Sequence, residues 1–578
     1  MHPAAHSAAH PAATAHTPAM LPTADDATTH TLLNCLLREV SGPEHQAIVS
    51  DGYLLIRLPR ADALLRVALR RTSLTGAHRF RGAAQRHTEH GWDPLEWPVL
   101  AGLIARELQA RSGEANAEFG DQVRSSRDTI ADLLAARPET PEPLGYLASE
   151  QALVFGHRFH PAPKAHGGGR EDRVRYGPES GRTVRLRYLA VRRDLVREQA
   201  ADPAALARFD AAATGVTAPA GFRLLPVHPW QWSLLAGNAA LRQALDDGRI
   251  RDLGVGGTEF TPTASVRTLA GDGFFLKFSL DLRITNCVRK NAAYELSGAV
   301  ALTRILADPA RATARRHPGF ALLPEPAYRT VDLGDTALLE GLGVIVREAG
   351  ELAAGPGVPL LAGAVADEYA VSAAHVSHLV GVPSPERLAA WWEAYVRLLV
   401  PPVLTLFFDH GVVLEPHLQN VLVCVDADGM PVRMVFRDLE GTKLLPDRHA
   451  RALAALPPAV AGPMTYDTER GWNRVVYCLL VNHIGETAAA LADLCPEAEP
   501  RLWAVVRAVL AEHARTYGCP PPLRALLAGV PLPAKANLMT RWRRAADREA
   551  GYVPLPSPLG AAFLLGAEGS AVDVEEAR

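Results

Sequence analysis

The sequence predicts a multidomain α+β fold in which helices alternate with antiparallel strand pairs. The chain has 578 residues, which is too long for one hydrophobic core and suggests roughly three or four domains. Apolar residues make up 48% of the chain and charged residues 21%, so a large core can form. Val-rich runs flank an Asp-Gly turn at Asp428-Gly429, as in a β-hairpin, while other segments repeat apolar residues at helical spacing.

The charge and the cysteines narrow the class of protein. A net charge of −3 argues against a nucleic-acid-binding protein, which usually shows a basic excess. The six cysteines lie far apart without a CxxC pair, so they indicate neither a disulfide framework nor a zinc site. Residues 1–20 lack the pattern of a secretory signal, and the apolar run at 398–408 is too short to span a membrane. We therefore expect a cytoplasmic protein that binds neither membrane nor nucleic acid.

The N-terminal part is expected to hold a tail and a mainly helical domain. Residues 1–27 are rich in Ala, His, Pro and Thr and cannot bury a core, which predicts a disordered tail. Its spaced histidines could bind a metal weakly, without fixed geometry. Residues 28–145 form the helical domain, because 31–40 and 94–113 show helical spacing, and one strand is expected at 51–59.

Two further domains are expected, 146–383 and 384–578, beyond a Pro-rich boundary at 137–145. In the first, strands are expected at 182–191, 222–230 and 273–286, and a helix at 294–308. The second domain opens with a helix that Ser384 caps. The hairpin at 414–441 and further helices follow, among them 501–517.

The predicted hairpin carries a polar cluster at its open end. His417 and Asn420 precede its first strand, and Asp438 and Glu440 follow its second strand. An amide oxygen beside a carboxylate suits Mg²⁺, which prefers oxygen ligands and usually keeps water and nucleotide phosphate in its shell. Kinase-like nucleotide sites pair an Asn with an Asp in this way. The alternative is a surface hairpin with polar ends.

Two other clusters have donors suited to anions. In 157–169, three histidines and a lysine precede three glycines, whose amides could approach phosphate. In 260–269, small hydroxyls flank Arg267, a fork-shaped donor for phosphate or carboxylate. These hydroxyls belong to Thr263, Ser265 and Thr268. The alternatives are a surface loop and an edge strand with a solvated arginine.

The densest cluster is 274–291. Lys277 lies within an aromatic and apolar strand, where a phosphate partner would neutralise it. Kinases also place a phosphate-binding lysine on a strand. Beyond Lys277, a patch of cationic and polar side chains suits a polyanion. This patch consists of Arg283, Thr285, Asn286, Arg289, Lys290 and Asn291. The alternative is a charged helix N-terminus on the surface.

Together these clusters predict a cleft for ATP, Mg²⁺ and an anionic small molecule. Glu415 lies at the spacing before Asn420 at which a protein kinase keeps its catalytic aspartate, so a small-molecule kinase is a rival interpretation. Against it, this loop has no HxD pair to hold a hydroxyl acceptor. The abundance of Arg and Lys also favours a substrate with more negative charge than a sugar.

These motifs resemble those of the IucA/IucC family, the siderophore synthetases that work without a peptide-synthetase assembly line. The resemblance covers nearly the whole chain after residue 28 and rests on five motifs in order. They are HxxHPxxK at 157–164, SxRT at 265–268, KxSLDxRITNxxRxN at 277–291, ExHxQN at 415–420 and RDxEG at 437–441. The resemblance implies a thumb (28–145), fingers (146–383) and palm (384–578) architecture, with a distantly kinase-like palm built on antiparallel strands.

The resemblance also implies a reaction. The family uses ATP and Mg²⁺ to adenylate a carboxylate, usually of citrate, with release of pyrophosphate. An amine or hydroxyl then attacks the acyl-adenylate to give an amide or ester and AMP. After the lysine of the first motif, the family often has Ser-Arg or Ala-Arg, whereas this chain has Ala165-His166-Gly167.

Site residues are implied position by position. The ATP-binding positions correspond to His160, Lys164, Ser265, Arg267, Thr268, Lys277, Asn420 and Asp438. The positions that bind the carboxylate substrate correspond to Thr285, Asn286, Arg289 and His417. Catalytic roles fall to Arg289, His417 and Lys277. Metal contacts fall to Asn420 and Asp438, with Glu415 and Glu440 as more remote candidates.

We therefore predict an ATP-dependent acid–amine ligase. It would condense citrate, or a citrate derivative, with an amine, a polyamine or a hydroxyl nucleophile to give a siderophore intermediate. One alternative is a small-molecule kinase, which would release ADP. The other is a non-catalytic citrate- or siderophore-binding protein, which would bind citrate without turning over ATP. A homodimer is the default assembly of the resembled family.

Overall fold

The computed structural model describes residues 21–137, 142–165, 167–284, 287–546 and 549–560, and the side chains of 283–289 lie outside the described part. The predicted tail, 1–27, falls mostly outside these residues. Its last four residues belong instead to helix α1, Ala24–Leu36, which Thr23 caps by accepting a hydrogen bond from the Asp26 backbone N–H at 3.1 Å. Two aspartates in the first turn also favour a helix start here.

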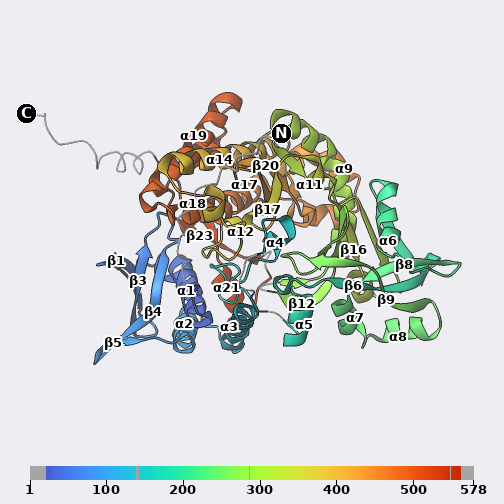
Figure 1. The fold of residues 1–578 in the computed structure, drawn as a ribbon, viewed down its shortest axis with the longest axis horizontal. Helices are drawn as coiled ribbons and strands as arrows, with labels where there is room; N and C mark the ends of the chain where they lie inside the picture. The colour runs from blue at the N-terminus through green and yellow to red at the C-terminus, as the bar shows by residue number, and fades with distance from the viewer. Residues whose placement is uncertain (1–20, 138–141, 166, 285–286, 547–548, 561–578) are drawn as a thin grey trace, which may run out of the picture.

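The N-terminal unit combines helices with a five-stranded antiparallel sheet, drawn in blue in Figure 1. The strands pair in the order β1 Ala47–Ser50, β2 Tyr53–Leu58, β3 Ala63–Arg71, β4 Arg79–Thr88 and β5 Gly91–Pro94. The helices are α1, α2 Trp97–Ser112 and α3 Phe119–Ala136. The prediction of a mainly helical domain is therefore wrong for residues 47–94, where only β2 was expected. The alternation typical of strands is hidden by Leu55 and Leu64 at outward positions and by two buried arginines, Arg71 and Arg79.

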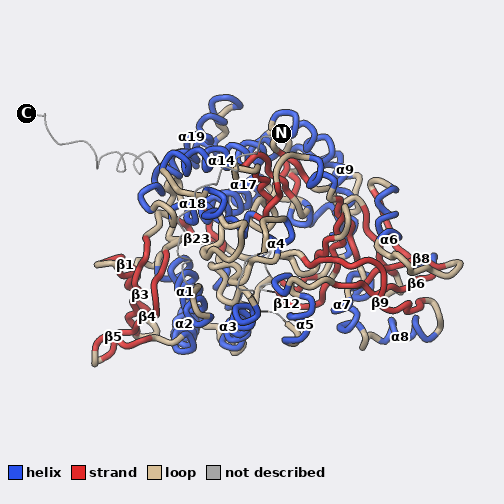
Figure 2. The backbone as a smooth tube through the Cα atoms, in the orientation of Figure 1, coloured by secondary structure: helices blue, strands red, loops and turns tan. Residues whose placement is uncertain are grey.

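The central unit is built on an eight-stranded sheet with its own apolar core. Its order is β7 Val196–Ala200, β15 Ala327–Val331, β16 Val344–Glu348, β11 Phe274–Phe278, β10 Thr268–Ala270, β9 Ile250–Pro262, β6 Val184–Arg192 and β8 Phe222–Val227. Small helices surround it: α5 Arg170–Tyr176, α6 Ala207–Ala211, α7 Pro229–Leu235, α8 Ala239–Asp246 and α10 Thr336–Gly341. Figure 2 draws the strands of this unit in red, with β6, β8 and β9 labelled. The expected strands are confirmed at 184–191, 222–227, 274–278 and 280–284. Residues 229–230 instead begin α7, and 285–286 lie outside the described residues.

The C-terminal unit contains a four-stranded sheet packed against long helices. The order is β14 Phe320–Leu322, β20 Pro431–Phe436, β19 Val421–Val425 and β17 Val358–Leu361. β19 and β20 form the predicted antiparallel hairpin, but β14 runs parallel to β20. Since β14 and β17 precede residue 384, the expected domain boundary there is wrong, because one sheet crosses it. The sheet is also not purely antiparallel.

The helices of this unit largely match the expectations from the sequence. α14 spans Pro385–Phe408, and the Ser384 side chain caps it by accepting the Arg387 backbone N–H at 3.1 Å, as predicted. α9 Ala293–Arg316 and α19 Glu499–Tyr517 cover the helices expected at 294–308 and 501–517. The remaining helices are α4 Tyr146–Glu150, α11 Gly350–Ala354, α12 Ala362–Val365, α13 Val376–Val380, α15 Pro446–Ala454, α16 Pro458–Ala461, α17 Thr468–Val476, α18 Gly485–Ala492, α20 Pro521–Leu527 and α21 Asn537–Trp542.

A continuous helical stretch, Thr468–Ala492, runs through the middle of this unit. It consists of α17, a π-helical segment at Tyr477–Ile484, and α18. By length and composition it could cross a membrane, yet its apolar window is completely buried inside the protein. That burial is typical of a core helix in a globular protein.

The end of the chain returns to the N-terminal unit. Leu538 and Trp542 of α21 belong to the same apolar cluster as the core of the five-stranded sheet. Glu39 fixes this contact, because its carboxyl oxygens accept the backbone N–H groups of Leu538 at 2.8 Å and Met539 at 2.9 Å. Residues 384–578 therefore do not form one separate domain, contrary to expectation.

Three short strand pairs complete the fold near the meeting point of the units. They are β12 Leu280–Ile284 with β13 Cys287–Arg289, β18 Val412–Val413 with β21 Lys443–Leu444, and β22 Leu532–Lys535 with β23 Tyr552–Leu555. The end of β11 and the open end of the β19–β20 hairpin meet here, which places the predicted motifs together.

Candidate active site

Lys277 forms the centre of a buried charge cluster. It lies on β11, whose five residues are all buried, and is itself 1% exposed. Its Nζ lies 2.5 Å from Asp438 Oδ1, 2.9 Å from Glu440 Oε2 and 3.9 Å from Glu325 Oε1. The structure thus brings the lysine of the third motif onto the acidic end of the hairpin.

The charges in this cluster hold one another ionised. Burial alone would lower the pKa of Lys277, but the carboxylates of Asp438, Glu325 and Glu440 outweigh it and raise that pKa. Burial opposes ionisation of Asp438 as well, yet Lys277 and Arg347 hold the pKa of its carboxyl well below the ordinary value. At neutral pH the cluster therefore contains true ion pairs rather than neutral groups.

Arg267 adds a second buried cation from a strained turn. The turn between β9 and β10 places Val266 at φ +66°, a backbone conformation that β-branched residues rarely adopt. Arg267 is 3% exposed, donates to Asn291 Oδ1 at 2.6 Å and forms an ion pair with Glu440. Strain of this kind is often found where a side chain must be held for function.

The hydroxyls predicted beside Arg267 serve this turn. Ser265 Oγ accepts the backbone N–H of Thr268 at 3.2 Å, and Thr263 Oγ1 donates to the Thr268 carbonyl at 2.8 Å. The Thr268 side chain is buried, whereas Ser265 is partly exposed. Ser265 therefore has access to a ligand, while Thr268 helps to shape the turn.

Three charged residues of the cluster have no motif in the sequence. Glu325 is fully buried and accepts from Arg347 Nε at 2.9 Å and from its terminal guanidinium nitrogen at 2.6 Å. Arg347, on β16, also lies 3.5 Å from Asp438 Oδ1. Glu150 of α4 pairs with Arg437 at 2.5 Å and accepts the Ala264 N–H at 3.0 Å. A charged residue inside an otherwise apolar segment is the sequence signal that could have pointed to them.

Asn420 and Asp438 meet at the open end of the hairpin, as predicted. The Arg437 backbone N–H donates to the Asn420 carbonyl at 3.0 Å, which joins the two ends. Asp438 takes a left-handed conformation with φ +74°, which turns its carboxylate toward Lys277. Asn420 is 6% exposed, and its side-chain amide makes no hydrogen bond to the residues that the structure describes.

His417 lies beside this hairpin as a neutral imidazole. Burial lowers its pKa to about 4, although the nearby Glu415 carboxylate acts in the opposite direction. A neutral ring can accept or donate one proton at neutral pH, which suits contact with a carboxylate or acyl group. Glu415 itself is tied to Arg474, whose Nε donates to it at 2.6 Å. Its carboxylate also packs against the Gly441 backbone.

The first motif, at 157–164, lies apart from the Lys277 cluster. His160 is 4% exposed, and its Nδ1 accepts the Ala162 N–H at 3.2 Å. Lys164 forms an ion pair with Glu179 and lines a cavity of about 360 Å³. Val266, next to Arg267, lines the same cavity. The structure thus connects Lys164 to the Arg267 turn through a cavity and not to Lys277 directly.

Three predicted residues cannot be placed. Thr285 and Asn286 lie outside the described residues, and so does the side chain of Arg289. The backbone of Arg289 belongs to β13, where it pairs with Leu280, three positions beyond Lys277. The strand pair therefore places the Arg289 backbone near the charge cluster.

The donor set fits a divalent metal with oxygen ligands. A carboxylate from Asp438 and the unengaged amide of Asn420 are suited to Mg²⁺, which commonly takes few protein ligands and completes its shell with water and phosphate. Among the described residues, no group of three or more His, Cys, Asp or Glu side chains could hold a metal alone. Glu440 is engaged by Lys277 and Arg267, and Glu415 by Arg474, which places both in supporting roles.

The comparisons with known proteins identify the family of this chain. The IucA / IucC family model matches residues 145–367, and a model described as ferric iron reductase FhuF-like transporter matches 389–551. The chain is 31% identical over 534 residues to the L-2,3-diaminopropanoate–citrate ligase of Staphylococcus aureus, covering 84% of this chain and 90% of that protein. It is 29% identical to the rhizobactin siderophore biosynthesis protein RhbC of Rhizobium meliloti, covering 92% and 97%.

A solved structure shows the same fold. ATP-bound aerobactin synthetase IucA from Klebsiella pneumoniae matches with a TM-score of 0.82 and 26% identity, covering 93% of this chain and 99% of that one. The match spans the N-terminal sheet, the central sheet and the C-terminal helices alike. The chain therefore belongs to the IucA/IucC family and is an enzyme, an acid–amine ligase of siderophore biosynthesis.

Proposed function

We propose that this ligase uses ATP to adenylate a carboxylate of citrate, or of a citrate derivative, and then joins the acyl group to an amine or hydroxyl nucleophile. The products are the amide or ester, AMP and pyrophosphate. The observation that carries the proposal is the Lys277 cluster, in which three buried cations face two partly exposed carboxylates. The named activities of the relatives, one of them a citrate ligase, support the choice of substrate.

The cations explain how two anions can react. A carboxylate oxygen that attacks the α-phosphorus brings negative charges together, so the site must supply positive charge where it develops. Lys277, Arg267 and Arg347 are held ready for this, because their ion pairs fix their positions before substrate arrives. Binding of the nucleotide exchanges these internal carboxylate partners for phosphate oxygens.

The metal is proposed to bind at the hairpin end. Asp438 and Asn420 would hold Mg²⁺, with water and nucleotide oxygens completing its shell. The metal would supply charge neutralisation for the triphosphate. Before substrate binds, the contact with Lys277 holds the Asp438 carboxylate in place.

The other motif residues have roles around this centre. We assign His417, Arg289, Thr285 and Asn286 to the carboxylate substrate and its activated acyl group. His417 stays neutral at pH 7, so it can hydrogen-bond the carboxylate without becoming trapped as an ion pair. His160, Lys164 and Ser265 are assigned to the nucleotide, Lys164 after release from Glu179.

The finer architecture also belongs to this proposal. We assign a thumb, fingers and a distantly kinase-like palm to the N-terminal, central and C-terminal units. The β19–β20 hairpin supports the assignment, since it carries Asn420 and Asp438 at its open end as a kinase-like site would. A cytoplasmic location fits an enzyme that consumes ATP, and a homodimer is expected.

The test is a citrate-dependent exchange of labelled pyrophosphate into ATP, together with hydroxylamine trapping across candidate carboxylates. Adenylation predicts exchange only when the correct acid is present, and a hydroxamate product from that acid. If none of the acids tried supports exchange and ADP is formed, the kinase alternative is supported. Citrate binding without exchange or ADP would support a binding protein.

A further inference from the structure

The loop that carries His417 is hydrogen-bonded to the π-helical segment Tyr477–Ile484. Asn482 Oδ1 accepts the backbone N–H of Leu418 at 3.1 Å. The adjacent residue, His483, donates from Nδ1 to the carbonyl of Pro416 at 2.8 Å. The residues immediately before and after His417 are therefore both fixed by neighbours on one helical segment.

Asn482 also reaches the loop of the first motif. Its Nδ2 donates to Nε2 of His157 at 2.9 Å. Burial lowers the pKa of His157 to about 3, so its ring is neutral at pH 7. One buried amide thus joins the 157–164 loop, expected to contact nucleotide, to the 415–420 loop, expected to contact the acyl group.

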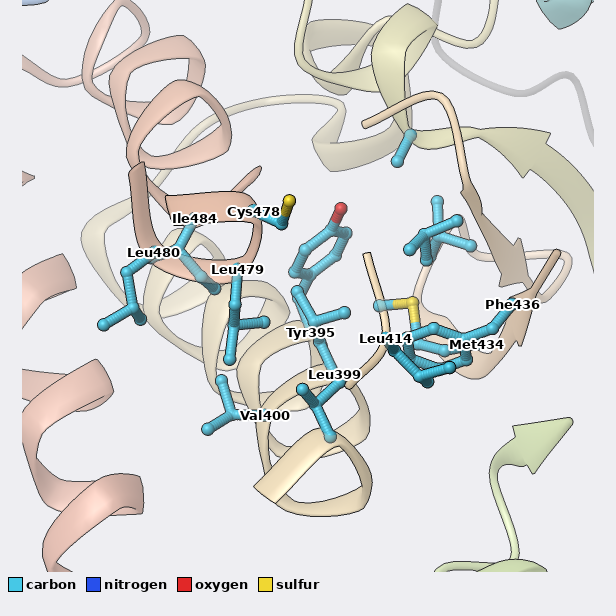
Figure 3. Packing of buried hydrophobic residues seen from close by; sticks show 14 of the residues in the cluster. Tyr395, Leu399, Val400, Leu414, Met434, Phe436, Cys478, Leu479, Leu480 and Ile484 are labelled. Atoms are coloured by element: carbon cyan, nitrogen blue, oxygen red, sulfur yellow. The ribbon is translucent and has the colours of Figure 1, made fainter. Parts of the chain in front are cut away.

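His483 is fixed in turn from α14. The Tyr395 hydroxyl donates to His483 Nε2 at 2.5 Å, which leaves the proton on Nδ1 to bond Pro416. Burial lowers the pKa of His483 to about 4, which keeps this neutral tautomer at neutral pH. Figure 3 shows Tyr395 between the π-helical residue Cys478 and the strand end at Leu414. His483 is completely buried and so makes this contact inside the core.

The widened helix explains why two successive residues face the same loop. π-helical turns usually occur as short insertions within an α-helix, and they are frequent at functional sites. Here the segment is flanked by regular helices α17 and α18, whose buried residues are largely apolar. A polar pair within such a stretch is costly unless each group is bonded, and both side chains find partners in the site loops.

We propose that Asn482 and His483 are positioning residues of the ligase, which hold the acyl-contacting loop and the nucleotide-contacting loop in one geometry. This inference rests on the proposed function, because it assigns the two loops their ligands. Loops are otherwise more mobile than the elements they connect, and a displacement of about 1 Å can cost on the order of a hundredfold in rate.

The experiment compares three variants by pyrophosphate exchange, with kcat and KM measured for ATP and for citrate. Asn482→Leu removes both loop contacts and is expected to lower kcat/KM by roughly a hundredfold. Asn482→Asp keeps an acceptor for Leu418 but loses the donor to His157, so KM for ATP should rise more than KM for citrate. Leu480→Ala is the matched control, since Leu480 is buried on the same π-helical segment and its apolar side chain cannot hydrogen-bond to either loop.

A double-mutant cycle tests whether Asn482 acts through its contact with His157. His157→Ala and Asn482→Leu should have non-additive effects on KM for ATP, because they remove one shared contact. Equal losses in kcat/KM for Asn482→Leu and Leu480→Ala, at equal loss of thermal stability, would overturn the inference. Should Asn482→Leu fail to fold, an unchanged KM for ATP in Asn482→Asp overturns it instead. A wild-type enzyme without any exchange would refute the proposed function and not this inference alone.

Discussion

Lys277 and Asp438 are 161 positions apart in the chain, yet the ammonium nitrogen of one lies 2.5 Å from a carboxylate oxygen of the other. This pair joins the central sheet to the C-terminal hairpin. Because Lys277 is 1% exposed, the contact lies at the base of the site, and the two units can form the charge cluster only together.

Lys277→Met is expected to lower citrate-dependent pyrophosphate exchange by on the order of a hundred- to a thousandfold. The substitution removes a cation from the place where charge develops and leaves three carboxylates facing one another. Arg329→Met is the control, since Arg329 is another buried cation of the same sheet, paired with Glu198 at 2.7 Å. Both variants should be less stable in urea unfolding. Only Lys277→Met should show less pyrophosphate exchange per amount of folded enzyme. Equal activity in the two would contradict the role of Lys277.

Arg289→Ala is expected to abolish adenylate formation while leaving the fold intact. The reason is that Arg289 follows the RITN motif on β13, whose backbone pairs with the strand next to Lys277. Lys290→Ala, one residue further along, removes a partly exposed cation that lies 3.7 Å from Glu340 and should retain exchange. Hydroxylamine trapping measures both variants, and full turnover by Arg289→Ala would refute the assignment.

Asp438 and Glu415 should differ in their effect on the metal requirement. Asp438→Asn is expected to raise the Mg²⁺ concentration needed for half-maximal exchange, because a neutral amide binds a divalent cation more weakly than a carboxylate does. Glu415→Gln should leave that concentration unchanged, since Glu415 is bound to Arg474. Mg²⁺ titrations at saturating ATP provide the measurement. An equal increase of this Mg²⁺ concentration in both variants would indicate that Glu415 also binds the metal.

Glu39 should make the stability of the protein depend on pH. Burial raises its pKa from 4.5 to about 8. Between these values the folded state keeps a proton that the unfolded state has released, so the free energy of unfolding falls as pH rises through this window. Glu39→Gln cannot titrate and should lack this contribution, so its stability relative to the wild type should improve from pH 5 to pH 8. Urea unfolding of both proteins at each pH checks it, and parallel pH curves would exclude the effect.

Much of the local structure could be predicted from the sequence. The hairpin at 414–441, the capped helix after Ser384 and the strand around Lys277 each carry a pattern that spans only neighbouring residues. The motifs at 265–268, 277–291 and 437–441 also converge in space as expected, and Lys277, Arg267 and Asp438 share one cluster.

The rest depends on contacts between distant segments. Glu325, Arg347 and Glu150 are ordinary residues in their own segments. Only the packing of separate elements turns them into partners of Lys277, Asp438 and Arg437, respectively. The N-terminal sheet was missed because leucines such as Leu55 and Leu64 occupy outward positions while Arg71 and Arg79 are buried. The expected boundary at 383/384 failed because β14 Phe320–Leu322 and β17 Val358–Leu361 complete a sheet whose other strands lie much later in the chain.

The central claim is that ATP is cleaved between its α and β phosphates by attack of a carboxylate held in the Lys277 cluster. The most direct measurement is the nucleotide product formed by the purified enzyme with ATP, Mg²⁺, citrate and an amine acceptor. The account predicts AMP and pyrophosphate in equal amounts, with their formation dependent on citrate and lost in Lys277→Met. Formation of ADP with a phosphorylated acceptor would contradict it.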